Sequence, residues 1–246
     1  MSLVFSNTTT KNGLIQLCEE YCGFNDGDIS GNTTRLAKFT GRLNNALSKA
    51  VSTIFEVGGT WQFDDSNQTD YPIITTNIVS GQRDYSFTAD GSGNLILDVY
   101  KVLVANQAGL YEEIWPVDQQ SYAPRNYLSG QNLGGIPITY DKTANGIFLD
   151  PIPNYNYTAG LKVLINREPS YFTTSDTTKK PGFAGLFHEY LAMHASYYYC
   201  LANQITNVKK DLKLEMLQME EDLKNYYKLR EQDNPKVLKP RRNMAN

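Results

Sequence analysis

The chain has 246 residues, of which 41% are hydrophobic and 20% are charged, a balance typical of globular proteins rather than disordered or fibrous ones. Its formal net charge of −3 excludes a global electrostatic attraction to nucleic acid or to an anionic membrane. No stretch approaches the roughly 18 apolar residues of a membrane span, and the N-terminus lacks the basic and apolar regions of a signal peptide. We therefore expect a soluble protein that does not bind a membrane.

Residues 1–59 predict an N-terminal helical segment. A short helix ends at Gly23, and a longer one begins after two N-cap candidates, Thr33 and Thr34. The apolar stripe of the longer helix consists of Leu36, Phe39, Leu43, Leu47, Ala50, Val51 and Ile54. Its opposite, mostly basic face consists of Arg35, Lys38, Arg42, Asn45 and Lys49. Because charged runs on helices usually face water, we interpret this face as a solvated surface.

Residues 60–175 predict a β-rich domain, because short β-branched and aromatic runs alternate with turns. The expected strands are 73–79, 85–87, 95–105, 111–117, 136–140, 147–149 and 161–166. The pair Asn145-Gly146 suits a hairpin turn, since both residues tolerate positive φ. The stretch 118–135 is predicted to be an ordered excursion or a long loop. Strands at this spacing, with no helical pattern between them, favour an antiparallel β-sandwich or barrel-like region.

Residues 176–232 predict a C-terminal helical segment that follows a breaker ending at Gly182. Its first apolar stripe consists of Phe183, Phe187, Leu191, His194, Tyr198 and Leu201, and a heptad-like seam consists of Leu212, Met216, Met219, Leu223 and Tyr226. A turn near 202–206 separates the two helices, and residues 233–246 form a flexible basic tail. The sequence thus predicts an α+β fold, in which N- and C-terminal helices form a bundle and the β-region is an insertion.

Candidate catalytic groups each lack a partner. His188 and His194 are six residues apart, so on a helix they point to different faces. The cysteines Cys18 and Cys22 lack the two-residue gap of zinc and redox motifs, and with Cys200 they suit free thiols packed in a core. The adjacent pair Asp64-Asp65 suits a polar turn better than a catalytic carboxylate pair. We predict a protein that is not an enzyme, with no catalytic, metal-binding or cofactor-binding residues and no cofactor.

The basic tail is the one local candidate for a specific contact. From Pro235 onward it carries Lys236, Lys239, Arg241 and Arg242 and no acidic side chain. These side chains could contact nucleic acid phosphates or an acidic groove on a partner, and a solvated end is the alternative.

A series of short motifs runs through most of the chain. It includes Trp61-Gln-Phe-Asp-Asp-Ser-Asn67, Tyr71-Pro-Ile-Ile-Thr-Thr-Asn77, Val79-Ser-Gly-Gln-Arg-Asp-Tyr85, Ile136-Pro-Ile-Thr-Tyr-Asp141, Ile147-Phe-Leu-Asp-Pro-Ile-Pro153, Arg167-Glu-Pro-Ser-Tyr-Phe-Thr173 and Asp176-Thr-Thr-Lys-Lys-Pro-Gly-Phe183, followed by Phe187-His188. In this order the motifs resemble a family of virion structural proteins of tailed bacteriophages, often found among head–tail connection genes. None of the motifs identifies a catalytic or ligand-binding residue.

The resemblance implies an adaptor of the head–tail connector, or neck, made in the cytoplasm of the bacterial host and located in the virion at the head–tail junction. It implies a homo-oligomeric ring of about twelve subunits beneath the portal. Its partners would be the portal protein and other neck or tail proteins, with DNA passing through the channel. The helical ends would build the ring and face the portal, and an exposed N-terminus and the basic tail would reach neighbouring subunits.

Other roles remain open at this point. A stopper or another tail component would have the same residue patterns. A tail-associated receptor- or carbohydrate-binding module would use aromatic side chains to stack on sugars, with Tyr122, Tyr127, Tyr155 and Tyr157 as candidates. A cell-wall hydrolase would need two carboxylates across a cleft or a metal site, and the sequence offers neither clearly.

Overall fold

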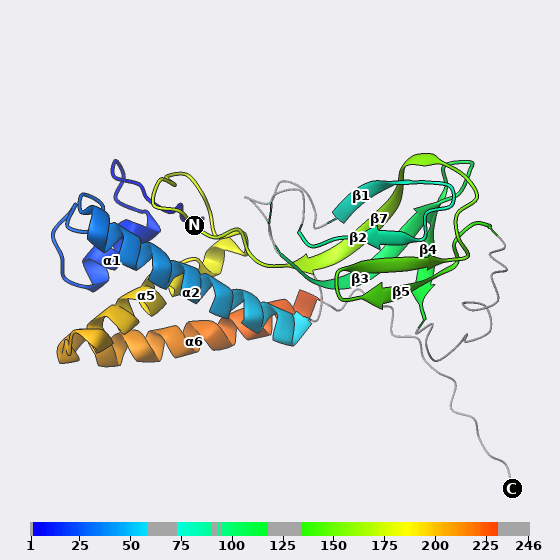
Figure 1. Cartoon of the computed structure of the whole chain (residues 1–246). Coiled ribbons are helices and arrows are strands. Elements are labelled where there is room, and N and C mark those ends of the chain that lie inside the picture. Colours follow the sequence, from blue (N-terminus) through cyan, green and yellow to red (C-terminus); the bar gives the residue numbers. More distant parts are fainter. Residues whose placement is uncertain (1, 59–72, 90–92, 94, 118–133, 231–246) are drawn as a thin grey trace, which may run out of the picture.

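The computed structural model describes residues 2–58, 73–89, 93, 95–117 and 134–230. In this part of the chain the protein has an α+β fold, with helices near both ends of the sequence and a curled, seven-stranded mixed sheet between them (Figure 1). None of the described helices combines the length and the apolar character that crossing a bilayer requires.

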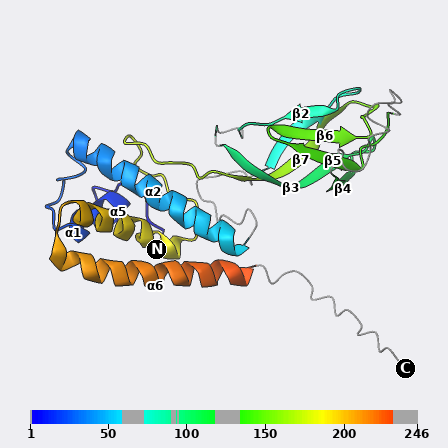
Figure 2. The same cartoon turned by 60° about the horizontal axis from the view of Figure 1, so that its bottom comes forward.

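Four α-helices share one hydrophobic core. They are α1 (Leu14–Tyr21), α2 (Thr33–Gly58), α5 (Glu189–Ala202) and α6 (Thr206–Arg230), and a single 3₁₀ turn, η1 (Gly185–Phe187), precedes α5. Figure 2 shows these helices grouped beside the sheet, and α5 packs against the other three. We call these helices, with the segments 2–13 and 168–188, the helical unit.

Helix α5 is buried more widely than the predicted stripe suggests. Its buried side chains are Tyr190, Leu191, Ala192, Met193, Ala195, Ser196 and Cys200. In contrast, Tyr198 is 46% exposed and Leu201 is 40% exposed, so the predicted stripe is wrong at its C-terminal end. The reason is that three helices surround α5, so its buried surface is broader than one helical face.

Two further buried contacts hold the helical unit together. The fully buried Phe5 stacks on Phe172 with ring centroids 5.0 Å apart. In the predicted seam on α6, Leu212, Met216 and Leu223 are buried. Tyr227 on the same helix was not part of the predicted seam. It is buried, and its hydroxyl accepts the N–H of Ala184 at 3.0 Å.

The sheet has the strand order β1-β7-β3-β4-β5-β6-β2. The strands are β1 (Ile73–Ile78), β2 (Asp84–Ser86), β3 (Ile96–Ala105), β4 (Tyr111–Pro116), β5 (Thr139–Thr143), β6 (Gly146–Asp150) and β7 (Tyr157–Arg167). All named pairings are antiparallel except β4 with β5, so the expectation of purely antiparallel pairing is wrong for that pair. A hairpin turn forces antiparallel pairing, whereas the long stretch between Pro116 and Thr139 permits a parallel return.

The inner face of the curled sheet forms a second hydrophobic core. It contains Ile78, Tyr85, Val102, Val104, Ile114, Tyr140, Ile147, Leu149, Tyr155, Leu161, Val163 and Ile165. The two edge strands approach each other where the loop after β1 leads into β2, and there the N–H of Val79 donates to the hydroxyl of Tyr85 at 3.1 Å. We call residues 73–167 the β unit.

The β5–β6 hairpin does not use the predicted turn conformation, and its glycine has another role. Neither Asn145 nor Gly146 has a positive φ, so the expected turn chemistry is wrong. Gly146 is required for another reason: a Cβ atom there would lie 2.4 Å from the carbonyl oxygen of Tyr85. The glycine therefore allows β2 to approach β6.

Candidate functional site

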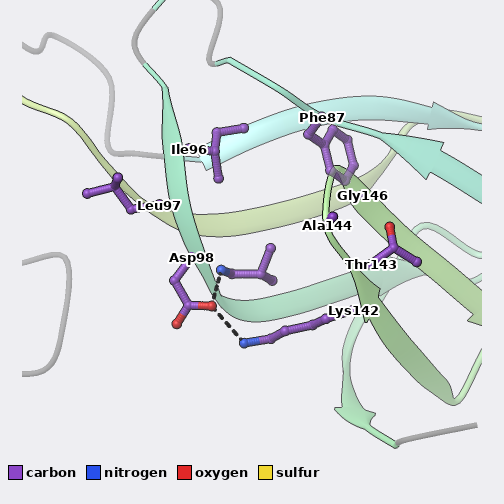
Figure 3. A pocket seen from close by; sticks show the side chains of 9 residues that line it. Phe87, Ile96, Leu97, Asp98, Lys142, Thr143, Ala144 and Gly146 are labelled. Carbon is purple, nitrogen blue, oxygen red and sulfur yellow. Dashed lines mark hydrogen bonds and ion pairs between the residues drawn. The ribbon is translucent and has the colours of Figure 1, made fainter.

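A shallow hollow lies in the β unit between the first half of β3 and the β5–β6 hairpin (Figure 3). Its volume is about 90 Å³, which corresponds to about three water molecules at ~30 Å³ each. The residues that line it are Phe87, Ile96, Leu97, Asp98, Val99, Lys142, Thr143, Ala144 and Gly146. The hollow is therefore comparable in size with one aliphatic side chain, and both apolar and charged groups border it.

The hollow exists because β4 is shorter than β3. The register pairs Val102 with Ile114, and β4 ends at Pro116, opposite the position of Tyr100. Ahead of that point, Ile96 N–H donates to the carbonyl of Thr88 at 3.3 Å. Between these two contacts, residues 97–99 have no strand beside them on this side within the described chain. This short stretch of β3 is an open backbone edge, the kind of site that can accept an added strand.

The carboxylate of Asp98 binds a backbone N–H of this open edge and gives the edge a negative charge. Its Oδ1 accepts the N–H of Val99 at 2.8 Å and lies 2.9 Å from Nζ of Lys142, as the dashed lines in Figure 3 show. The side chains of Asp98 and Lys142 are 57% and 42% exposed, so the ion pair contributes little to stability. Both contacts use Oδ1.

Exposed apolar side chains flank the hollow. Leu97 is 53% exposed, and Tyr100 on the same strand and Leu95 just before it are also exposed. A second exposed apolar group lies at the β4–β5 junction, where Trp115 and Ile138 are each 64% exposed. Single exposed apolar residues are ordinary, but several of them beside an open edge indicate an interaction surface.

The two histidines are committed to internal contacts in the helical unit. His188 is fully buried: the N–H of Leu3 lies 3.0 Å from its Nδ1, and its Nε2 lies 2.8 Å from the carbonyl oxygen of Phe183. A neutral ring protonated on Nε2 satisfies both contacts. His194 packs against the rings of Tyr190 and Tyr198, with centroids 5.7 and 4.7 Å away. Burial lowers the pKa of both imidazoles.

The cysteines also lie inside the helical unit. Cys18 and Cys200 are buried and Cys22 is half-buried, and all three are free thiols. Burial raises the pKa of Cys22 to about 12 and raises that of Cys18 further still, so neither thiol ionises near neutral pH. Among the described residues, no group of three or more His, Cys, Asp or Glu side chains is placed to hold a metal ion.

Some side chains of the basic face of α2 also make contacts within the molecule. The guanidinium of Arg35 lies 5.0 Å from the centre of the Phe24 ring, and that of Arg42 lies 5.6 Å from the Tyr199 ring. Lys49 forms an ion pair of 3.5 Å with Glu220 on α6. Three of the basic side chains therefore contact neighbouring groups, while the face as a whole is exposed apart from the half-buried Arg42, as predicted.

The N-terminal segment is held in place, contrary to the expectation of an exposed N-terminus that reaches neighbours. The N–H of Phe5 donates to the carbonyl of Lys179 at 2.7 Å, and that of Ser6 donates to Thr177 at 3.1 Å. His188 holds Leu3, as described above. Residues 3–6 are therefore part of the helical unit, because they satisfy backbone groups of the segment that leads to α5.

Several predicted site residues lie outside the described residues. These are the basic residues Lys236, Lys239, Arg241 and Arg242, the pair Asp64-Asp65, and two of the sugar-stacking candidates, Tyr122 and Tyr127. Of the other two candidates, Tyr155 is buried and donates its hydroxyl to the carbonyl of Ala105 at 2.7 Å, and Tyr157 is half-buried. Tyr155 therefore cannot stack on a sugar at the surface.

No family model matches this sequence, and no curated protein matches it either. The candidate site is thus defined by geometry alone.

The sequence did not single out Asp98, Lys142 or Leu97. Leu97 and Asp98 are neighbours on β3, whereas Lys142 lies on β5, and the register of β3, β4 and the β5–β6 hairpin brings the two strands together there. A polar Asp98 in the middle of the longest aliphatic run was the one available signal, because a charged residue interrupts the pattern of a buried strand there.

Proposed function

We propose that the protein is a structural subunit of the head–tail connector of a tailed-phage virion, with no enzymatic role, and that it forms a ring joining the portal to the tail. The observation that supports this most is the separation of two hydrophobic cores, one shared by α1, α2, α5 and α6 and one inside the curled sheet. A subunit built in this way offers different surfaces to two successive components. The series of motifs that resembles phage virion proteins supports the same assignment.

In this proposal the N- and C-terminal helices form the bundle that builds the ring and faces the portal. The exposed polar faces of α2 and α6 supply lateral surfaces for contacts repeated about a ring axis. The β unit, with its exposed apolar side chains, is then presented to the next component of the neck. The site of action is the head–tail junction of the virion.

Several potentially reactive side chains of the helical unit have structural contacts. His188 holds the N-terminal segment, and the phenol of Tyr21 donates to the carboxylate of Glu189. These contacts stabilise the fold, because they bind parts of the chain to one another.

The alternative is a tail-associated receptor- or carbohydrate-binding module. The exposed Trp115 is the observation that favours it, since an indole on a sheet surface can stack on a sugar ring. Binding of the purified protein to a glycan panel, abolished by Trp115→Ala, is the expected result for that function. A connector subunit should show no such binding.

The decisive experiment is native mass measurement of the full chain, alone and mixed with a candidate portal protein. The proposal predicts a discrete ring, or a discrete complex with the portal. A monodisperse monomer that never joins a portal-containing complex would contradict it.

A further inference from the structure

We propose that the hollow beside Asp98 is the docking site for residues 235–240 of a neighbouring copy of this chain. This inference rests on the proposed ring, because it names the contact by which one subunit holds the next. It joins an open backbone edge on one copy to an extended basic and apolar segment of another.

The receiving surface combines a backbone edge, an apolar void and a carboxylate. Residues 97–99 of β3 can pair with an added extended segment, since among the described residues no strand lies beside them there and Asp98 caps the edge. The void of about 90 Å³ has room for one aliphatic side chain between Phe87, Ile96 and Val99. The exposed Leu97 is available to cover the incoming segment.

The C-terminal segment has the matching composition. Its sequence Pro235-Lys-Val-Leu-Lys-Pro240 places two apolar residues between two lysines and two prolines. Proline fixes its own φ and disfavours helix at the residue before it, so this segment is suited to an extended conformation. In an extended chain the side chains of Val237 and Leu238 point to opposite sides, and one of them can enter the void while the other faces outward.

Charge favours the same pairing. Residues 235–246 carry four basic side chains and no acidic one, whereas Asp98 presents an exposed carboxylate. Lys236 or Lys239 can bind Oδ2 while Lys142 keeps Oδ1. The pairing therefore adds a second cation to Asp98 without breaking the existing ion pair.

The segment also has the reach to bridge two subunits. The residues after α6 could span up to about 50 Å when extended. The N-terminal residues 3–6, in contrast, are bound within their own helical unit. A contact from each subunit to the next is a heterologous one, the type that closes into a ring.

Disulfide trapping on the full chain tests this contact. Protein carrying Leu97→Cys is mixed with protein carrying Leu238→Cys under mild oxidation by oxidised glutathione, and covalent dimers are measured on a non-reducing gel. The matched control replaces Leu97→Cys with Leu110→Cys, a leucine that is at least as exposed and lies outside the hollow lining. The native cysteines are buried or half-buried and should react slowly.

We expect at least about tenfold more dimer from the Leu97 mixture than from the Leu110 mixture, because docking raises the effective concentration of the two thiols. Equal yields would overturn the inference. A chain that carries both substitutions tests the alternative contact. A cross-link that forms only within such single chains would also overturn the inference, since the segment would then occupy its own hollow. Native mass measurement of the unmodified chain separates the two proposals: a ring without the Leu97 cross-link keeps the connector function and rejects this docking site.

Discussion

Asn44 on α2 holds Phe172 by two hydrogen bonds, one to each backbone group of that residue. The N–H of Phe172 donates to Asn44 Oδ1 at 2.8 Å, and Asn44 Nδ2 donates to the carbonyl oxygen of Phe172 at 3.0 Å. A single side chain thus fixes the segment that returns from β7 to the helical unit, at the residue whose ring stacks on Phe5.

Replacing this amide should destabilise the helical unit. In Asn44→Ala, two partly buried backbone groups lose their partners, and we expect the free energy of unfolding to fall by about 1–3 kcal/mol. Urea unfolding followed by far-UV circular dichroism measures the change. The neighbouring exposed residue supplies the control, since Asn45→Ala should change stability by no more than about 0.5 kcal/mol. Equal losses of unfolding free energy in both variants would contradict the role of Asn44 in holding Phe172.

The buried carboxylate of Glu19 organises the loop between α1 and α2. Its Oε1 accepts the N–H groups of Ile29 and Ser30, each at 2.9 Å, and its Oε2 accepts that of Gly27 at 3.2 Å. Glu19→Ala leaves these donors without an acceptor, so a loss of about 1–3 kcal/mol in unfolding free energy is expected. The exposed Glu20, replaced by alanine, is the control. Faster amide hydrogen exchange at residues 27–30 in the Glu19 variant alone would locate the effect.

The buried histidines predict a loss of stability in mild acid. Burial lowers the pKa of His188 and His194 in the folded protein below the value of about 6.5 for a free imidazole. The unfolded chain therefore binds more protons in this range, and stability is complete above pH 6.5 and falls as the pH drops below it. Urea midpoints measured between pH 7.5 and 5.5 check this expectation. His188→Gln and His194→Gln should each make the midpoint less dependent on pH, and unchanged slopes in both would refute this explanation.

Two glycines should respond in opposite directions to alanine. At Gly146 the added Cβ meets the carbonyl oxygen of Tyr85, so β2 must move, and we expect a loss of about 1–3 kcal/mol. At Gly41, on the exposed side of α2, no atom lies within 4 Å of the added Cβ. There the alanine should stabilise the protein by about 0.5–1 kcal/mol, because it limits the unfolded chain and favours helix. Thermal unfolding of the two variants should shift in opposite directions.

Local patterns in the sequence predicted most elements well. The helix α2 could be predicted from its apolar stripe, which is a property of residues close in sequence. The predicted N-caps Thr33 and Thr34 are wrong, because the side chain of Asn32 caps the helix by accepting the N–H of Arg35 at 3.0 Å. The strand β7 begins at Tyr157, earlier than the predicted start at residue 161. The prediction missed its first residues because Gly160 interrupts their strand pattern in the sequence. These differences concern boundaries rather than the type of element.

Contacts between distant segments could not be predicted. The parallel pairing of β4 with β5 depends on where the chain returns after Pro116, and the Asp98–Lys142 contact depends on that pairing. The burial of Phe5 was equally hidden, because the residues after it are polar and resemble a loose terminus. Such features follow from the packing of the whole chain and leave no periodic pattern.

The attachment of the N-terminal segment also sets an order for folding during synthesis. Leu3 is bound by a residue 185 positions later in the sequence, and Phe5 packs on Phe172. The helical core therefore cannot be completed until nearly the whole chain has left the ribosome. The named strand pairings of the β unit, in contrast, all lie between Ile73 and Arg167, so its sheet can form while α5 and α6 are still being made. Leu3 and Phe5 thus find their partners only after the strands of the β unit have been made.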